Sequence, residues 1–169
     1  MSSSPYRKSP YSDKKQIPWR ARSVTIIGEA PNAQGKEKYD TVSGQRIAAW
    51  AGTELPWHNI HGALPPKWSN RVSRIRVRDW VAQHPKDDQP FILLGRKVQN
   101  AFYIPRGAES FEWYMSPVHH HPMVLFPHTS PLNRFWNDEA NVARATELLH
   151  QLVSGELPRH DYKKVDETA

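Results

Sequence analysis

The sequence contains no cysteine. Disulfides, thiolate zinc sites, iron–sulfur clusters and a cysteine nucleophile are therefore excluded, and a reducing, cytoplasmic location fits this absence. The sequence also lacks any apolar run near the ~20 residues that a membrane helix needs. Its first 16 residues carry positive charge without the apolar stretch of a secretory signal. We expect a cytoplasmic protein that does not enter a membrane.

Acidic residues are too few to balance the basic ones. The chain has 23 Lys and Arg residues against 17 Asp and Glu residues, which gives a formal net charge of +6 and a pI near 9.7. Such a balance favours a polyanionic partner, most often nucleic acid, although it also serves plain solubility. With 169 residues, the chain is long enough for one domain with a buried core.

Composition divides the chain into three parts. Residues 1–22 are rich in Ser, Pro, Lys and Arg and predict a flexible basic arm. Residues 23–157 alternate short apolar runs with helical patterns, and residues 158–169 form a polar tail. The predicted strands lie at 23–30, 55–62, 89–95 and 121–128, and the predicted helices begin near residues 43, 69, 95 and 138. This alternation predicts an α/β fold whose parallel sheet is covered on both faces.

Polar residues follow the predicted strands. In an open parallel sheet, sites form beyond the carboxyl ends of the strands, which selects the segments GEAPN, HNIHG, LGRK and PHTSPLN. Glu29 in GEAPN has the chemistry to position or activate a water, or else it caps backbone amides. Neither the GxxxxGK[ST] spacing of a P-loop nor the GxGxxG of a dinucleotide loop is present.

Two of these segments offer groups that suit a nucleobase. Asn59 in HNIHG carries donors and an acceptor, which match a base edge, although a turn asparagine is the simpler interpretation. His128 follows the last predicted strand, where an imidazole can donate a hydrogen bond to a developing oxyanion. Ser130 suits a phosphate oxygen, and Leu132 a wedge in a base stack. The histidines at 119–121 make a poor chelate because neighbouring strand residues face opposite ways, so we expect no metal.

Taken in order over residues 24–152, these motifs resemble the uracil-DNA glycosylase superfamily. GEAPN is similar to the first motif of that superfamily, which reads GEAPG in one branch, and PHTSPLN is similar to the second, which reads HPSPLS in the best-known branch. HNIHG occupies the place of the base-reading asparagine, and ILLGRKVQNAF is similar to the strand and helix between the motifs. The resemblance implies a three-layer α/β/α sandwich with a central four-stranded parallel sheet.

The resemblance also implies an activity. A base would be flipped out of DNA and its N-glycosidic bond hydrolysed, with no metal or cofactor and with DNA as the partner of a monomer. The catalytic residues would be Glu29 and His128. The flipped base would be bound by Ala30, Tyr39, Val42 and Asn59. The DNA would be contacted by Ser43, Ser130, Leu132, Asn133 and Arg134.

The sequence departs from that superfamily at informative positions. Ala30 stands where the best-known branch has an aspartate, so the water-handling role passes to Glu29, with Glu37 or Asp40 in reserve. The four cluster-binding cysteines of the GEAPG branch are missing. Where that branch has a base-stacking phenylalanine, this chain has DTVSG, with Val42 near its place and Tyr39 three residues earlier.

These departures leave two interpretations open. A weaker stacking platform gives either a roomier pocket for a modified or bulky pyrimidine or a poor glycosylase. We therefore expect a monofunctional DNA glycosylase, acting in repair or in defence against phage with modified DNA. The alternative is a catalytically weak DNA-binding protein of the same fold that recognises a modified base or an abasic site. For Phe135 and Trp136, beyond the second motif, we expect a role as anchors of the last helix, with stacking on DNA as the alternative.

Overall fold

The computed structural model of the chain describes residues 24–83, 89–116, 121–157 and 162–165. The expected basic arm at 1–22 lies outside the described residues, as do His119 and His120 and most of the expected polar tail. The described ranges include the central residues of all four predicted strands and all four predicted helices.

Six strands form one sheet, which is mostly parallel. The strand order is β2-β1-β3-β5-β4-β6, and the four neighbours β2, β1, β3 and β5 run parallel. The strands are β1 (Thr25–Gly28), β2 (Trp57–Asn59), β3 (Phe91–Leu94), β4 (Trp113–Met115), β5 (Pro122–Phe126) and β6 (Lys163–Lys164).

The expected count of four strands was wrong, because two short strands extend one edge. The four predicted parallel strands all form, while β4 pairs antiparallel with β5, and β6 pairs with β4. β4 has only three residues, and β6 consists of two exposed lysines within the stretch expected as a polar tail. Strands this short carry no alternation of apolar and polar residues, so sequence periodicity does not reveal them.

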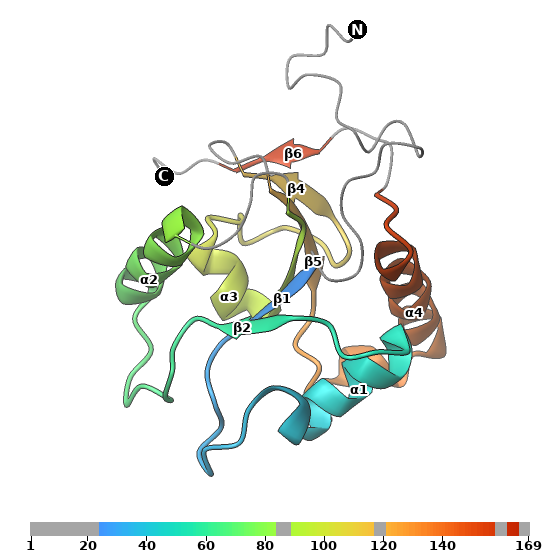
Figure 1. The fold of residues 1–169 in the computed structure, drawn as a ribbon, viewed down its shortest axis with the longest axis horizontal. Helices are drawn as coiled ribbons and strands as arrows, with labels where there is room; N and C mark the ends of the chain where they lie inside the picture. Colours follow the sequence, from blue (N-terminus) through green and yellow to red (C-terminus); the bar gives the residue numbers. More distant parts are fainter. Residues whose placement is uncertain (1–23, 84–88, 117–120, 158–161, 166–169) are drawn as a thin grey trace, which may run out of the picture.

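The helices cover both faces of the sheet and confirm the three-layer arrangement (Figure 1). On one face lie α1 and α4, and on the other lie α2 and α3. Their bounds are Val42–Ala51 for α1, Asn70–Gln83 for α2, Gly95–Ala101 for α3 and Glu139–Val153 for α4, with 3₁₀ turns η4 at Lys38–Asp40 and η5 at Arg134–Asn137. Side-chain caps start two of them: the Thr41 hydroxyl accepts the Gly44 N–H before α1, and the Asp138 carboxylate accepts the Ala140 N–H before α4.

Two apolar layers hold the sandwich together. The strands TIIG, FILL and PMVLF are buried at every position because helices cover both of their faces. Trp136, only 3% exposed, packs among the buried side chains between the sheet and the pair α1 and α4. It therefore anchors the segment before α4, as expected. None of the described helices has the length and apolar character needed to cross a membrane.

The layer under α4 gives a direct test of the core. Leu149 is fully buried there, and we expect Leu149→Ala to lower the free energy of unfolding by about 2–5 kcal/mol in urea denaturation, because it removes packed methyl groups and leaves a cavity. The matched control is Leu132→Ala, since Leu132 is 91% exposed; its effect should stay within about 0.5 kcal/mol. Equal effects of the two substitutions would contradict this assignment of core and surface.

Candidate active site

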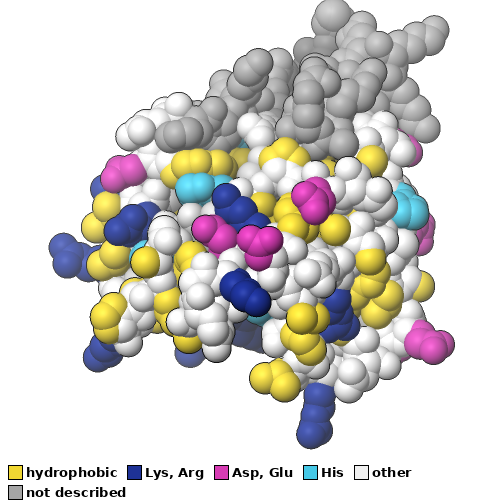
Figure 2. Space-filling model, turned by 60° about the horizontal axis from the view of Figure 1, so that its bottom comes forward, with side chains coloured by type: hydrophobic (Ala, Val, Ile, Leu, Met, Phe, Trp, Pro, Cys, Tyr) yellow, Lys and Arg dark blue, Asp and Glu magenta, His cyan; other side chains and the backbone are white. Residues whose placement is uncertain are grey.

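The carboxyl ends of the four parallel strands form one edge of the molecule, on the lower side in Figure 1. Asn59 ends β2, Glu29 follows β1, Gly95 follows β3 and His128 follows β5 by two residues. Neighbouring strands lie about 4.8 Å apart, so these positions succeed one another along a short edge. Figure 2 turns this side forward and shows acidic side chains near its middle, with Lys and Arg side chains around them.

Gly95 is the point at which the two expected catalytic residues meet. Its φ of +83° lies in the left-handed region, and a Cβ on it would lie 3.3 Å from the Cβ of His128 and 3.5 Å from Oε2 of Glu29. The carboxylate and the imidazole therefore flank one bare stretch of backbone. Below it, the Gln99 side-chain amide donates to the carbonyls of Leu93 and Phe126 and ties the ends of β3 and β5 together.

His128 is held through its ring and through its backbone carbonyl. The ring nitrogen Nδ1 accepts the backbone N–H of Ser130 at 3.1 Å. The backbone carbonyl of His128 accepts the side-chain amide N–H of Asn133 at 2.8 Å and the indole N–H of Trp136 at 2.9 Å. Because Nδ1 accepts a hydrogen bond, it carries no proton, and the neutral ring carries its proton on Nε2. Nε2 is then a hydrogen-bond donor.

Helix α1 fixes the loop that carries His128. The Thr129 hydroxyl donates to the Ser43 carbonyl at 3.2 Å, and Arg46 donates to the carbonyls of Thr129 and Ser130 at 3.4 and 3.3 Å. The guanidinium of Arg46 also lies over the Trp50 ring. Sequence reasoning missed Arg46, and no signal could have found it, because its partners lie more than 80 residues away.

The expected DNA-contact residues divide into exposed and internal ones. Leu132 and Arg134 project into solvent, and Ser130 and Ser43 are half-buried nearby. The side chain of Asn133 instead serves the loop, since its amide donates to the His128 carbonyl and its oxygen accepts the Phe135 N–H at 3.1 Å. We therefore assign Asn133 a positioning role.

Asn59 sits in a hydrogen-bonded row of three side chains. Its Oδ1 accepts the Trp57 indole N–H at 3.0 Å, and its Nδ2 donates to Oε1 of Glu37 at 3.0 Å. Both Trp57 and Asn59 crowd the backbone of Gly28, where a Cβ would lie 2.5 Å from the Asn59 oxygen. Sequence reasoning missed Trp57 as a hydrogen-bond partner of Asn59. The signal was present, because residues 57 and 59 are two apart on one strand and therefore share a face. For Glu37, sequence reasoning considered only the role of positioning or activating a water.

The other expected base-binding residues are Tyr39 in η4, Val42 at the start of α1 and Ala30 after β1. The Tyr39 hydroxyl donates to the Leu55 carbonyl at 2.6 Å, and its ring meets Trp57 edge-on at 5.4 Å. Burial raises the pKa of Tyr39 to about 12, so the phenol stays protonated at neutral pH. Val42 is 57% exposed at the start of α1, and Ala30 is half-buried beside Glu29.

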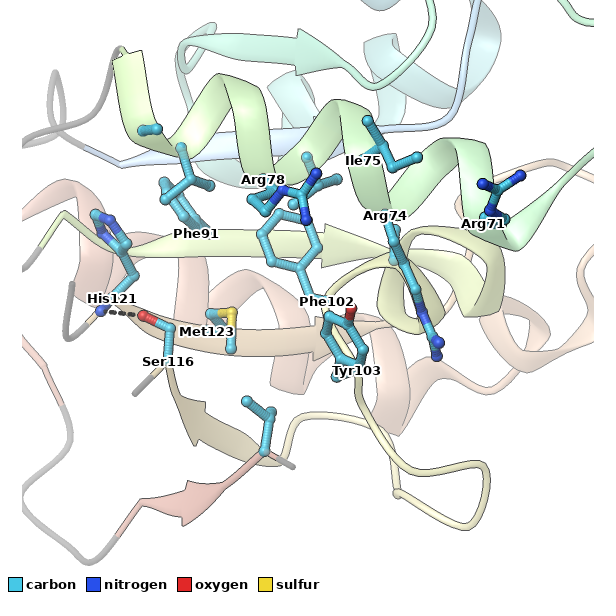
Figure 3. A pocket seen from close by; sticks show the side chains of 15 residues that line it. Arg71, Arg74, Ile75, Arg78, Phe91, Phe102, Tyr103, Ser116, His121 and Met123 are labelled. Carbon is cyan, nitrogen blue, oxygen red and sulfur yellow. Dashed lines mark hydrogen bonds between the residues drawn. The ribbon is translucent and has the colours of Figure 1, made fainter. Parts of the chain in front are cut away.

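Two of the hollows formed by the described residues lie against the sheet. A cleft of about 360 Å³ borders Gly95, Pro127, His128 and Phe135. A larger hollow of about 630 Å³ lies under α2 (Figure 3). There the guanidinium carbon of Arg74 lies 4.2 Å from the centre of the Tyr103 ring. The larger hollow runs along α2 from Phe91, at the start of β3, to Tyr103, which follows α3. Among the described residues, no group of three His, Asp or Glu side chains is arranged to hold a metal.

No family model matches the chain, and no curated protein does. The resemblance to the uracil-DNA glycosylase superfamily therefore rests on the four motifs and their order along the chain.

The contact at Gly95 leads to a prediction. We expect Gly95→Ala to cost about 1–2 kcal/mol of folding free energy, because alanine is strained at positive φ, and to displace His128, because the new Cβ presses on it. Urea denaturation measures the first effect and the NMR signals of the His128 ring the second. Gly62→Ala is the control, since a Cβ there meets nothing within 4 Å. Unchanged ring signals would show that Gly95 does not set the position of His128.

Proposed function

We propose that the protein is a monofunctional DNA glycosylase that flips a uracil-like or modified pyrimidine out of DNA and hydrolyses its N-glycosidic bond. The observation that carries the proposal is the approach of Glu29 and His128 to one bare backbone position, Gly95, at the carboxyl edge of the sheet. Such an edge is where open parallel sheets bind their ligands. The four motifs of the resemblance support the same activity.

His128 acts on the leaving base. When the bond between C1′ and the base nitrogen breaks, the electron pair stays on the base, which becomes an anion. The Nε2–H of His128 donates a hydrogen bond to a carbonyl oxygen of that anion and lowers the barrier. The backbone N–H of Ser130 on Nδ1 supports this role because it keeps the proton on the catalytic nitrogen.

Glu29 acts on the sugar side. As the base leaves, positive charge grows on the sugar, and a carboxylate nearby stabilises it. Water then forms the new bond to C1′, and its proton passes to the Glu29 carboxylate. The 3.5 Å from Oε2 of Glu29 to the Cβ position on Gly95, beside His128, supports action of both residues on one bond.

The surroundings suit DNA. A base inside a duplex is out of reach, so it must leave the stack at a cost of a few kcal/mol. The exposed side chain of Leu132 fills the gap, and Arg134 on η5 together with the surrounding Lys and Arg side chains binds phosphates (Figure 2). The enzyme acts in the cytoplasm as a monomer, either in repair or in defence against phage with modified DNA.

Replacement of His128 tests the chemistry. We expect His128→Gln to slow single-turnover base release by about 100- to 10,000-fold, because it removes the donor to the leaving base, while leaving DNA affinity nearly unchanged. His150→Gln is the control, because His150 is exposed on α4. Abasic sites revealed by alkali give the rate, and an unaltered rate would remove His128 from the mechanism.

The wedge role of Leu132 predicts a difference between duplex and single strand. In duplex DNA the leucine offsets the unstacking cost, so we expect Leu132→Ala to slow base release roughly tenfold or more. From single-stranded DNA the variant should release the base at nearly the wild-type rate, because an unpaired base leaves no gap in a duplex for a leucine to fill. The quantity to compare is the ratio of the two rates in parent and variant, and an equal loss on both substrates would argue against a wedge.

A second function is favoured by one observation. Ala30 stands where the best-known branch carries its aspartate, so a chain of this fold can lose catalysis and keep recognition. In that case the protein binds a modified base or an abasic site without releasing any base. Tight binding with no abasic product from any DNA tested would support this function over the glycosylase.

A further inference from the structure

The larger hollow, under α2, has an apolar interior and no acidic lining. Phe91 of β3, Phe102 after α3 and Met123 of β5 line it with side chains that are almost fully shielded from solvent. Ile75 of α2, which is 39% exposed, and the half-buried Tyr103 line its more open part. None of the described residues that line the hollow is Asp or Glu. Its volume of about 630 Å³ suits a small organic molecule.

Three arginines line the same hollow from one face of α2. Arg74 and Arg78 follow Arg71 by three and seven residues, and this spacing places side chains on the same face of a helix. Among the residues that the structure describes, none of the three forms a salt bridge. Positive charge that no described acid neutralises therefore borders an apolar interior.

Arg74 is already held in place on the wall of the hollow. Its Nε donates to the Asn100 carbonyl at 3.1 Å, and its guanidinium lies over the ring of Tyr103, toward which it reaches from α2 in Figure 3. Tyr103 has a φ of +63°, a left-handed conformation that is uncommon for a residue with a side chain. The two terminal NH₂ groups of Arg74 have no hydrogen-bond partner within the described ranges. They form the planar fork that matches a carboxylate or a phosphate.

We propose that this hollow binds a small amphipathic anion. Its apolar body lies between α2 and the sheet, and its carboxylate or phosphate is held by Arg74 and Arg78, with Arg71 adding positive charge nearby. Charge complementarity selects the anionic head, and the apolar interior selects the body, because a bare inorganic anion would leave that interior unused. The hollow shares no residue with the candidate active site, so the proposal does not rest on the glycosylase.

Four probes separate the head from the body. Isothermal titration calorimetry of the full chain measures binding of octanoate, octyl phosphate, octanol and acetate, with the octyl compounds kept below their micelle concentrations. Octanol keeps the body without the charge, and acetate keeps the charge without the body. At least one octyl anion should bind with one molecule per chain and roughly tenfold or more tightly than octanol or acetate. The tighter of the two anions identifies the head as a carboxylate or a phosphate.

A matched pair of arginines locates the binding. We expect Arg78→Gln to weaken binding of the tighter octyl anion by roughly five- to tenfold, because it removes a charged donor, and to leave octanol binding unchanged. Arg76→Gln is the control, since it removes the same charge from the same helix at an exposed residue that does not line the hollow. Its binding should equal that of the parent.

A second pair keeps the test decisive should Arg78→Gln fail to fold. Ile75→Asp places a negative charge on the lining of the hollow and should weaken binding of the octyl anion at least fivefold, roughly. Val72→Asp adds the same charge to α2 at a position that is 43% exposed and outside the hollow, and it should change binding little.

Two results would overturn the proposal. If neither octyl anion binds more tightly than octanol and acetate, the arginines only shield apolar surface with their methylene stems while their charged ends stay in water. If Arg78→Gln and Arg76→Gln weaken binding equally, the anion responds to the overall charge of the helix and not to the hollow. Neither result bears on the glycosylase, which is measured by base release.

Discussion

Two positions without a side chain determine how close the functional groups of this protein come to one another. At Gly28 a Cβ would lie 2.5 Å from the amide oxygen of Asn59 and 2.7 Å from the indole nitrogen of Trp57, whereas at Gly95 a Cβ would touch His128 and Glu29 at 3.3 and 3.5 Å. Both glycines lie at the carboxyl ends of central strands, β1 and β3. A side chain at Gly28 would collide with the Asn59 amide, and one at Gly95 would be strained at a φ of +83° and press on His128, so the site depends on these two glycines.

The parallel sheet makes this arrangement possible. The strands β1, β3 and β5 are buried at every position, so their side chains serve the core. The polar groups of the edge come from residues just beyond these strands and from Asn59, the last residue of the half-buried β2. The ladder between β1 and β2 continues beyond the last strand residue, since the Ile60 and His61 N–H groups donate to the carbonyls of Gly28 and Glu29. Glu29 is therefore positioned by regular sheet hydrogen bonds and not by a mobile loop.

Local sequence patterns are enough to predict part of the site. Glu29 and His128 come directly after apolar runs, so their place at the edge can be inferred from strand prediction and the rule for parallel sheets. The strands β4 and β6, which extend the sheet beyond β5, were too short to carry a periodic signal, and the strand count was wrong for that reason. Arg46 and Glu37 could not be assigned, because their partners are brought to them only by the folded sandwich.

The order of strands separates two tasks within one site. Asn59 and Glu37 lie on the β2 side of β1, whereas the Glu29 carboxylate approaches Gly95 and His128 on the β3 side. In the best-known branch of the resembling superfamily the acidic residue is one position later, at Ala30 here. Side chains of neighbouring residues in an extended chain point in opposite directions. A carboxylate at position 29 therefore faces the side opposite to that of a carboxylate at position 30. The approach of Glu29 to the His128 side is what makes that move compatible with the proposed chemistry.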